Sequence, residues 1–131
     1  MPISVAWHDD GKTIVRLVFD APWTLAELGD AVRESRALIT SVPRMVDVIW
    51  DATEAGGVPR NVITHFLLNL EIVQIPANQG AVIVVARSTF LQNFARLAKR
   101  SLPKITRNMH IVDTLANAEA LIASLREARA S

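Results

Sequence analysis

The chain has 131 residues, half of them apolar and 21% charged, and its formal net charge is only +1. These values indicate a single folded domain over residues 1–131, and they argue against a disordered chain and against a protein that coats nucleic acid. The absence of cysteine excludes a disulfide framework, a thiolate zinc site, an iron–sulfur cluster and a cysteine nucleophile.

The N-terminal sequence MPISVAWHDDGK has acids where a signal peptide needs an apolar run behind basic residues. No apolar run reaches the roughly 18 residues that cross a bilayer. We therefore expect a cytoplasmic protein with no transmembrane segment.

Two apolar runs, at residues 3–7 and 13–19, flank the polar stretch HDDGK and predict a β-hairpin. Residues 24–39 then predict a helix, because apolar side chains recur there at helical intervals. Thr24 and Glu27 have the spacing of a capping box at its start.

The apolar run MVDVIW at residues 45–50 predicts a buried strand that ends at Asp51 and opens into the loop DATEAGGVPRNV. Residues 62–75 predict a second helix that follows Pro59. Residues 80–86 read GAVIVVA, and a run that is apolar at every position is typical of a central strand covered on both faces. A parallel sheet is therefore expected.

Thr89 and Gln92 have capping-box spacing ahead of a third predicted helix, FLQNFARLAKRSL, at residues 90–102. A short strand at residues 109–112 and a terminal helix at residues 115–130 complete the chain. The element order is β-β-α-β-α-β-α-β-α, which predicts an α/β fold with about four helices on a mixed, mostly parallel five-stranded sheet.

This order, together with the strand before Asp51, the run GAVIVVA and the final DTLANAEALIASL, resembles the STAS domains. These are the bacterial anti-sigma-factor antagonists and their SpoIIAA-like relatives. The resemblance implies a serine, phosphorylated as a switch, about eight residues beyond the strand-terminal aspartate. Pro59, Arg60 and Asn61 stand there instead, so the loop resembles the family's switch loop without its switch.

Asp51 is the main candidate for chemistry, because polar residues at the end of a buried strand are well placed to contact a ligand. An enzyme would need Asp51 to meet His8 or His65 at hydrogen-bond distance. Its other role is to accept backbone N–H bonds from the loop, and we favour this structural role. Neither the glycines of the loop nor the histidines match a phosphate-binding or metal-binding spacing, so we expect no catalytic residue, no cofactor and no metal.

The third predicted helix and its flanks are basic. Residues 72–112 contain no acid and six bases. This pattern fits a solvated helix face, or a site for an acidic protein, an anionic lipid headgroup or a phosphate-bearing ligand. The apolar side of this helix, which includes Leu97, is predicted to face inward. Nucleic acid is not expected, because the aromatic residues Phe90 and Phe94 lie on that inward side and not beside the charges. The candidate anion-binding residues are Arg87, Arg96, Lys99, Arg100 and Lys104.

The second predicted helix has an apolar arc wider than one buried face needs, which indicates either deeper burial or a docking face. Asn61, His65, Leu68 and Ile72 are the candidate partner-binding residues. The first function hypothesis is therefore a non-catalytic regulatory or scaffold module that binds a protein partner or forms a homodimer. The alternative is a carrier of a small apolar ligand or lipid, since SpoIIAA-like domains are similar in fold to lipid-transfer domains. An enzyme that uses Asp51 with a histidine is the third.

Overall fold

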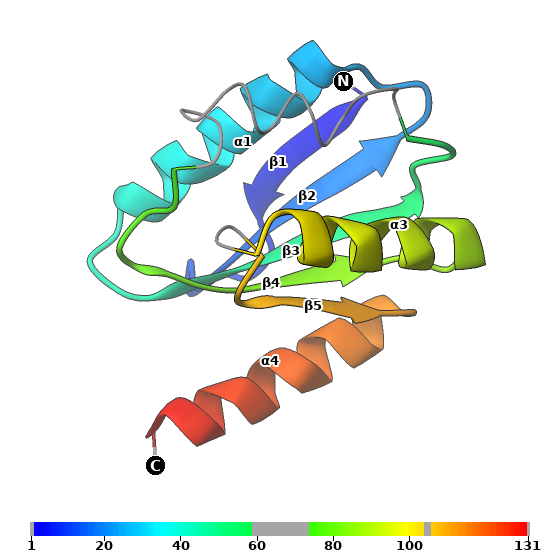
Figure 1. Cartoon of the computed structure of the whole chain (residues 1–131). Helices are drawn as coiled ribbons and strands as arrows, with labels where there is room; N and C mark the ends of the chain where they lie inside the picture. Colours follow the sequence, from blue (N-terminus) through cyan, green and yellow to red (C-terminus); the bar gives the residue numbers. More distant parts are fainter. Residues whose placement is uncertain (1, 59–73, 104–105, 131) are drawn as a thin grey trace.

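The computed structural model describes residues 2–58, 74–103 and 106–130. Within these residues the protein is α/β, with three helices and a five-stranded mixed sheet (Figure 1). In chain order the elements are β1 (Ile3–Trp7), β2 (Ile14–Asp20), α1 (Leu25–Thr40), β3 (Val46–Glu54), β4 (Gln79–Val85), α3 (Thr89–Ser101), β5 (Met109–Val112) and α4 (Leu115–Ala130).

The α/β class and the mixed sheet are confirmed, whereas the predicted second helix falls mostly outside the described residues. Its last two positions, Gln74 and Ile75, are described and are not helical. The count of four helices and the complete element order therefore stay predictions.

The strands lie in the order β1-β2-β3-β4-β5. β1 pairs antiparallel with β2, as the predicted hairpin requires, and the other three pairs are parallel. β4 carries the run that is apolar at every position and lies between two parallel neighbours. This confirms the prediction of a covered, parallel strand.

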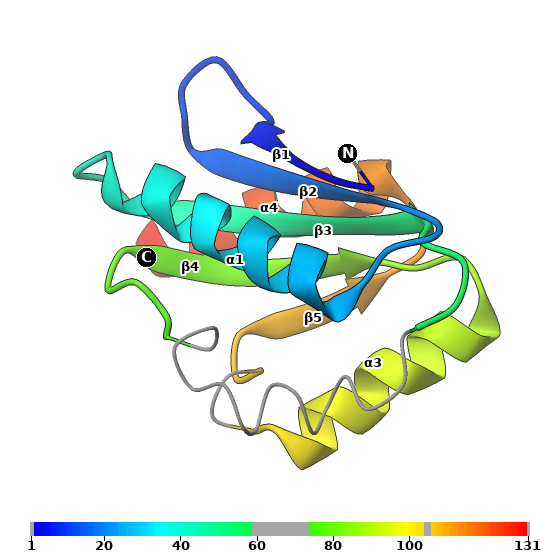
Figure 2. The same ribbon diagram turned by 90° about the horizontal axis from the view of Figure 1, so that it is seen from above.

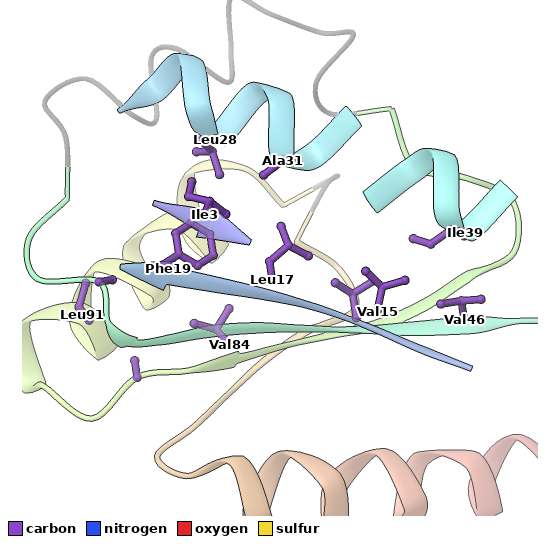
Figure 3. Packing of buried hydrophobic residues seen from close by; sticks show 13 residues of the cluster. Ile3, Val15, Leu17, Phe19, Leu28, Ala31, Ile39, Val46, Val84 and Leu91 are labelled. Carbon is purple, nitrogen blue, oxygen red and sulfur yellow. The ribbon is translucent and has the colours of Figure 1, made fainter. Parts of the chain in front are cut away.

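The side chains of each strand alternate between two apolar layers. One layer packs against α1 and α3, and the other packs against α4 (Figures 1 and 2). In the first layer Leu28, Ala31 and Ile39 of α1 lie over β2 and its neighbours (Figure 3). Each buried aliphatic side chain contributes about 1.5–3 kcal/mol. The second layer is formed by Ile14, Ile49, Ala81, Ile83, Val85, Ala118 and Ile122.

The predicted capping box of α1 is present. The Thr24 hydroxyl accepts the backbone N–H of Glu27 at 3.1 Å, and the Glu27 carboxylate accepts that of Thr24 at 2.9 Å. The capping box predicted for α3 from Thr89 and Gln92 is wrong, because Ser88 caps this helix by accepting the Leu91 N–H at 3.0 Å, and leucine cannot complete a box. Both residues carry a hydroxyl that can cap a helix, and the spacing to Gln92 favoured Thr89.

Candidate functional site

A cavity with a volume of about 190 Å³ lies between α1, α3 and the sheet. Val58 and Gln74, which border residues outside the described part, also line it. Its wall is almost entirely apolar because it is built from the layer that faces α1 and α3 (Figure 3). The principal apolar lining residues are Leu17, Phe19, Leu28, Val32, Val48, Trp50, Val82, Val84, Leu91, Phe94, Ala95 and Ala98.

Aromatic rings form one end of this cavity. Phe19 packs edge-on against Trp23, with ring centroids 5.2 Å apart, and lies 5.7 Å from the ring of Trp50. The indole N–H of Trp23 donates to the Ala55 carbonyl at 3.0 Å, so its polar atom has a hydrogen-bond partner. This end therefore offers rigid apolar surface.

Polar side chains come from the other end, where the second half of α1 meets the start of β4. Ser35, Arg36, Gln74 and Gln79 line the cavity there. A guanidinium N–H of Arg36 donates to the Gln74 side-chain oxygen at 3.2 Å. Arg36 is the one charged residue among the described lining residues, so the cavity has an apolar body and a polar end.

The predicted inward orientation of α3 is correct only in part. Leu91 and Ala95 are buried, but 62% of Phe90 and 49% of Leu97 are exposed to solvent. Phe90 and Leu97 are therefore corrected to surface residues, and Phe90 no longer counts against a nucleic-acid partner. Phe94 is half-buried and lines the cavity.

The predicted basic surface is present over α3. Arg87, Arg96 and Arg100 are exposed, and Lys99 is half-buried. Lys104 lies outside the described residues. Lys99 acts on His110 of β5, since burial and then the charge of Lys99 lower the histidine pKa below its ordinary value of 6.5.

Asp51 is not at the tip of its strand, because β3 continues to Glu54. Its carboxylate accepts a hydrogen bond from Arg16 at 2.6 Å and one from the Thr53 hydroxyl at 2.7 Å. Burial acts to raise the Asp51 pKa, but these bonds outweigh it and hold the pKa below its ordinary value of 3.8. The carboxylate is thus ionised and engaged within the sheet.

The histidines required by the enzyme hypothesis are not brought to Asp51 in the described residues. His8 lies 3.2 Å from a carboxylate oxygen of Glu119 on α4, and His65 lies outside the described part. Asp51 joins β3 to β2 through Arg16, as expected for a structural carboxylate. One atom of this pair, the Arg16 Nε, is buried and has no hydrogen-bond partner.

Sequence reasoning missed a second and more deeply buried carboxylate. Asp47 on β3 has no solvent-exposed surface, and one oxygen accepts hydrogen bonds from Arg126 and Arg129 of α4, each at 2.9 Å. Its other oxygen accepts the Ala81 N–H at 2.8 Å. The sequence features that could have predicted this cluster are one acid inside an apolar strand and two arginines three residues apart on a helix.

Neither a metal centre nor a membrane span is found in residues 2–58, 74–103 and 106–130. No three histidine or acidic side chains gather there around a common point, and no helix combines the length and apolar character needed to cross a bilayer. The candidate partner-binding residues Asn61, His65, Leu68 and Ile72 lie outside the described part. Comparison with family models, with curated proteins and with solved structures gives no match for this chain.

Proposed function

We propose that this protein is a non-catalytic binding module that holds a small apolar ligand or lipid in the cavity between α1, α3 and the sheet. The observation that carries the proposal is the cavity itself, with about 190 Å³ of volume and a wall of aliphatic and aromatic side chains. Ligand sites in proteins have this composition, with a few polar groups that fix the orientation of the ligand.

The volume of the cavity supports this proposal. An engineered apolar cavity of about 150 Å³ accepts benzene, so this one suits a ring or a short stretch of acyl chain. At about 24 cal/mol per Å³, an unfilled volume of about 190 Å³ costs at most about 4–5 kcal/mol. Because domains are stable by only about 5–15 kcal/mol, a ligand that fills the cavity offsets a sizeable fraction of this cost.

The polar side chains at one end of the cavity indicate which end of a ligand lies where. The polar end of a ligand fits beside Ser35 and Gln79, and an apolar body fits beside Trp23 and Trp50. The proposed ligand class is therefore a single-chain amphiphile. Asp51 has no part in this function, since Arg16 and Thr53 engage its carboxylate.

Self-association is the other binding mode proposed from the sequence, and it goes with the resemblance to STAS and SpoIIAA-like domains. Its residues, Leu68 and Ile72 among them, lie outside the described part, so it stays a prediction. Native mass spectrometry tests both modes at once, because one spectrum reports the oligomeric state and any co-purified ligand. A dimer that dissociates on Leu68→Asp plus Ile72→Asp would support self-association.

Ligand binding is tested with a matched pair of variants. Ala98→Phe places a ring in the cavity, whereas Ala120→Phe places the same ring on the exposed side of α4. Titration with a medium-chain fatty acid is followed by tryptophan fluorescence, because Trp23 and Trp50 both line the cavity. We expect saturable binding in the wild type and in Ala120→Phe, and at least tenfold weaker binding in Ala98→Phe. No bound mass in the native spectrum and no saturable response in the wild type would contradict the proposal.

A further inference from the structure

The outer side of α3 exposes apolar side chains together with positive charge. Phe90 and Leu97 are seven residues apart, which is two helical turns, and therefore lie on the same side of the helix. Phe90 is 62% exposed and Leu97 is 49% exposed. Arg87, Arg96 and Arg100 are exposed beside them. These five residues are named the α3 surface.

No acid in the sequence from residue 72 to residue 112 offsets the charge of the α3 surface. The described acid nearest to it in sequence is Asp113, which lines a shallow depression together with Arg96 and accepts a hydrogen bond from Asn117 at 2.7 Å. Arg96 itself donates to Asn93 at 3.0 Å. The segment from residue 72 to residue 112 is therefore positively charged, and a surface built from it attracts an anionic partner.

We propose that the α3 surface docks this protein on an anionic lipid bilayer, with Phe90 and Leu97 inserted at the interface and the arginines on headgroups. Helices that lie in a bilayer interface combine phenylalanine and leucine on one side with arginine and lysine on another. The choice of a bilayer rests on the proposed function, because α3 also supplies Leu91, Phe94 and Ala98 to the cavity wall. An acyl chain that leaves the bilayer at α3 therefore has only the width of this helix to cross.

A bilayer fits this surface better than a single-stranded nucleic acid does. Nucleic-acid grooves stack successive bases on several exposed aromatic rings, whereas Phe90 is the one strongly exposed aromatic residue in the described part of the chain. Leu97 offers a base no ring to stack on, but it adds apolar area that a bilayer buries. Figure 2 shows α3 along the β5 edge of the sheet and α4 on the other face, so α4 does not cover this surface.

Vesicle flotation tests the inference. The full chain is mixed with vesicles of phosphatidylcholine alone or with about one-third phosphatidylglycerol, at low and high salt. We expect flotation only with the anionic vesicles and only at low salt, because salt screens exposed charges. Arg96→Gln plus Arg100→Gln is expected to weaken binding about 30-fold, because each basic residue contributes a factor of about five and the two factors multiply. Lys12→Gln plus Arg33→Gln removes the same charge outside α3 and is expected to change binding less than threefold.

The apolar contribution has its own variant and its own control. Phe90→Ser plus Leu97→Ser is expected to weaken vesicle binding at least tenfold. The control Met45→Ser removes an apolar side chain before β3 that is as exposed as Leu97, and it is expected to leave vesicle binding unchanged. Fatty-acid binding in solution should stay unchanged in the α3 surface variants. Ala98→Phe should lose the fatty acid but still float, so failure of docking and failure of the cavity proposal are distinguishable. Equal flotation with neutral vesicles, or retention on a single-stranded oligonucleotide without flotation, would overturn the inference.

Discussion

The buried carboxylate of Asp47 provides the sharpest test of what holds α4 on the sheet. Arg126 and Arg129 both donate to it, and about one-third of each arginine side chain is exposed while Asp47 is fully buried. Arg126→Met plus Arg129→Met keeps the aliphatic stems but leaves the carboxylate with the Ala81 N–H as its remaining bond. A buried charge without a partner costs about 3–5 kcal/mol. We expect the free energy of unfolding to fall by this amount.

The effect of Asp47→Asn on stability is expected to have opposite signs in the wild type and in the double methionine variant. In the wild type, Asp47→Asn removes charge-assisted bonds to two arginines that can still reach water, and is expected to cost about 2 kcal/mol. In the double methionine variant the same substitution removes a stranded charge and is expected to restore stability by about 1–2 kcal/mol. The assay is urea unfolding followed by tryptophan fluorescence, with equal denaturant slopes required for comparison.

Arg33→Met serves as the control, because its ion pair with Asp30 is exposed on α1 and is expected to contribute less than about 1 kcal/mol. If Asp47→Asn destabilises both backgrounds equally, the two arginines do not compensate the buried charge. The inference that these two ion pairs anchor α4 would then be wrong.

Three further outcomes follow from the structure. Gly80→Ala is expected to lose about 1–3 kcal/mol in urea unfolding, because the new Cβ would overlap the buried aspartate and its arginine. Thr53→Val removes a hydrogen bond that lowers the Asp51 pKa. In the wild type, the stability contributed by ionised Asp51 is lost as the pH falls through that lowered pKa, so the free energy of unfolding of the variant should fall less between pH 7 and pH 2. Lys99→Met should raise the His110 pKa, measured by NMR titration, yet leave it below 6.5, because burial also lowers it.

Much of the fold follows from local patterns that physical chemistry ties to one structure. The hairpin, the capping box of α1 and the covered strand β4 were predicted from turn residues, cap spacing and a continuous apolar run, respectively. Each of these signals depends on neighbours in sequence. The strand end at Asp51 was predicted wrongly, because the bond from Arg16, 35 residues away, satisfies a carboxylate inside the strand.

The candidate site was less predictable, because it depends on which elements face one another. The cavity takes its wall from two helices and several strands, and no single segment carries its signal. The exposure of Phe90 was missed because apolar periodicity marks a helix face but not whether another element covers its margin. Arg36, the charged lining residue, has no distinguishing spacing in the sequence.

The two faces of the sheet divide stability and binding between them. Side chains alternate along β3, so Asp47 and Asp51 point toward the α4 side with Ile49, whereas Val48 and Trp50 point toward the cavity. Both buried carboxylates and their arginine partners therefore lie on the face opposite the cavity. Ionic groups in the cavity wall would hold water and weaken the binding of an apolar ligand. With both carboxylates on the other face, Arg36 is the one charged side chain among the described residues of the cavity wall, and the ion pairs that anchor α4 do not contact the cavity.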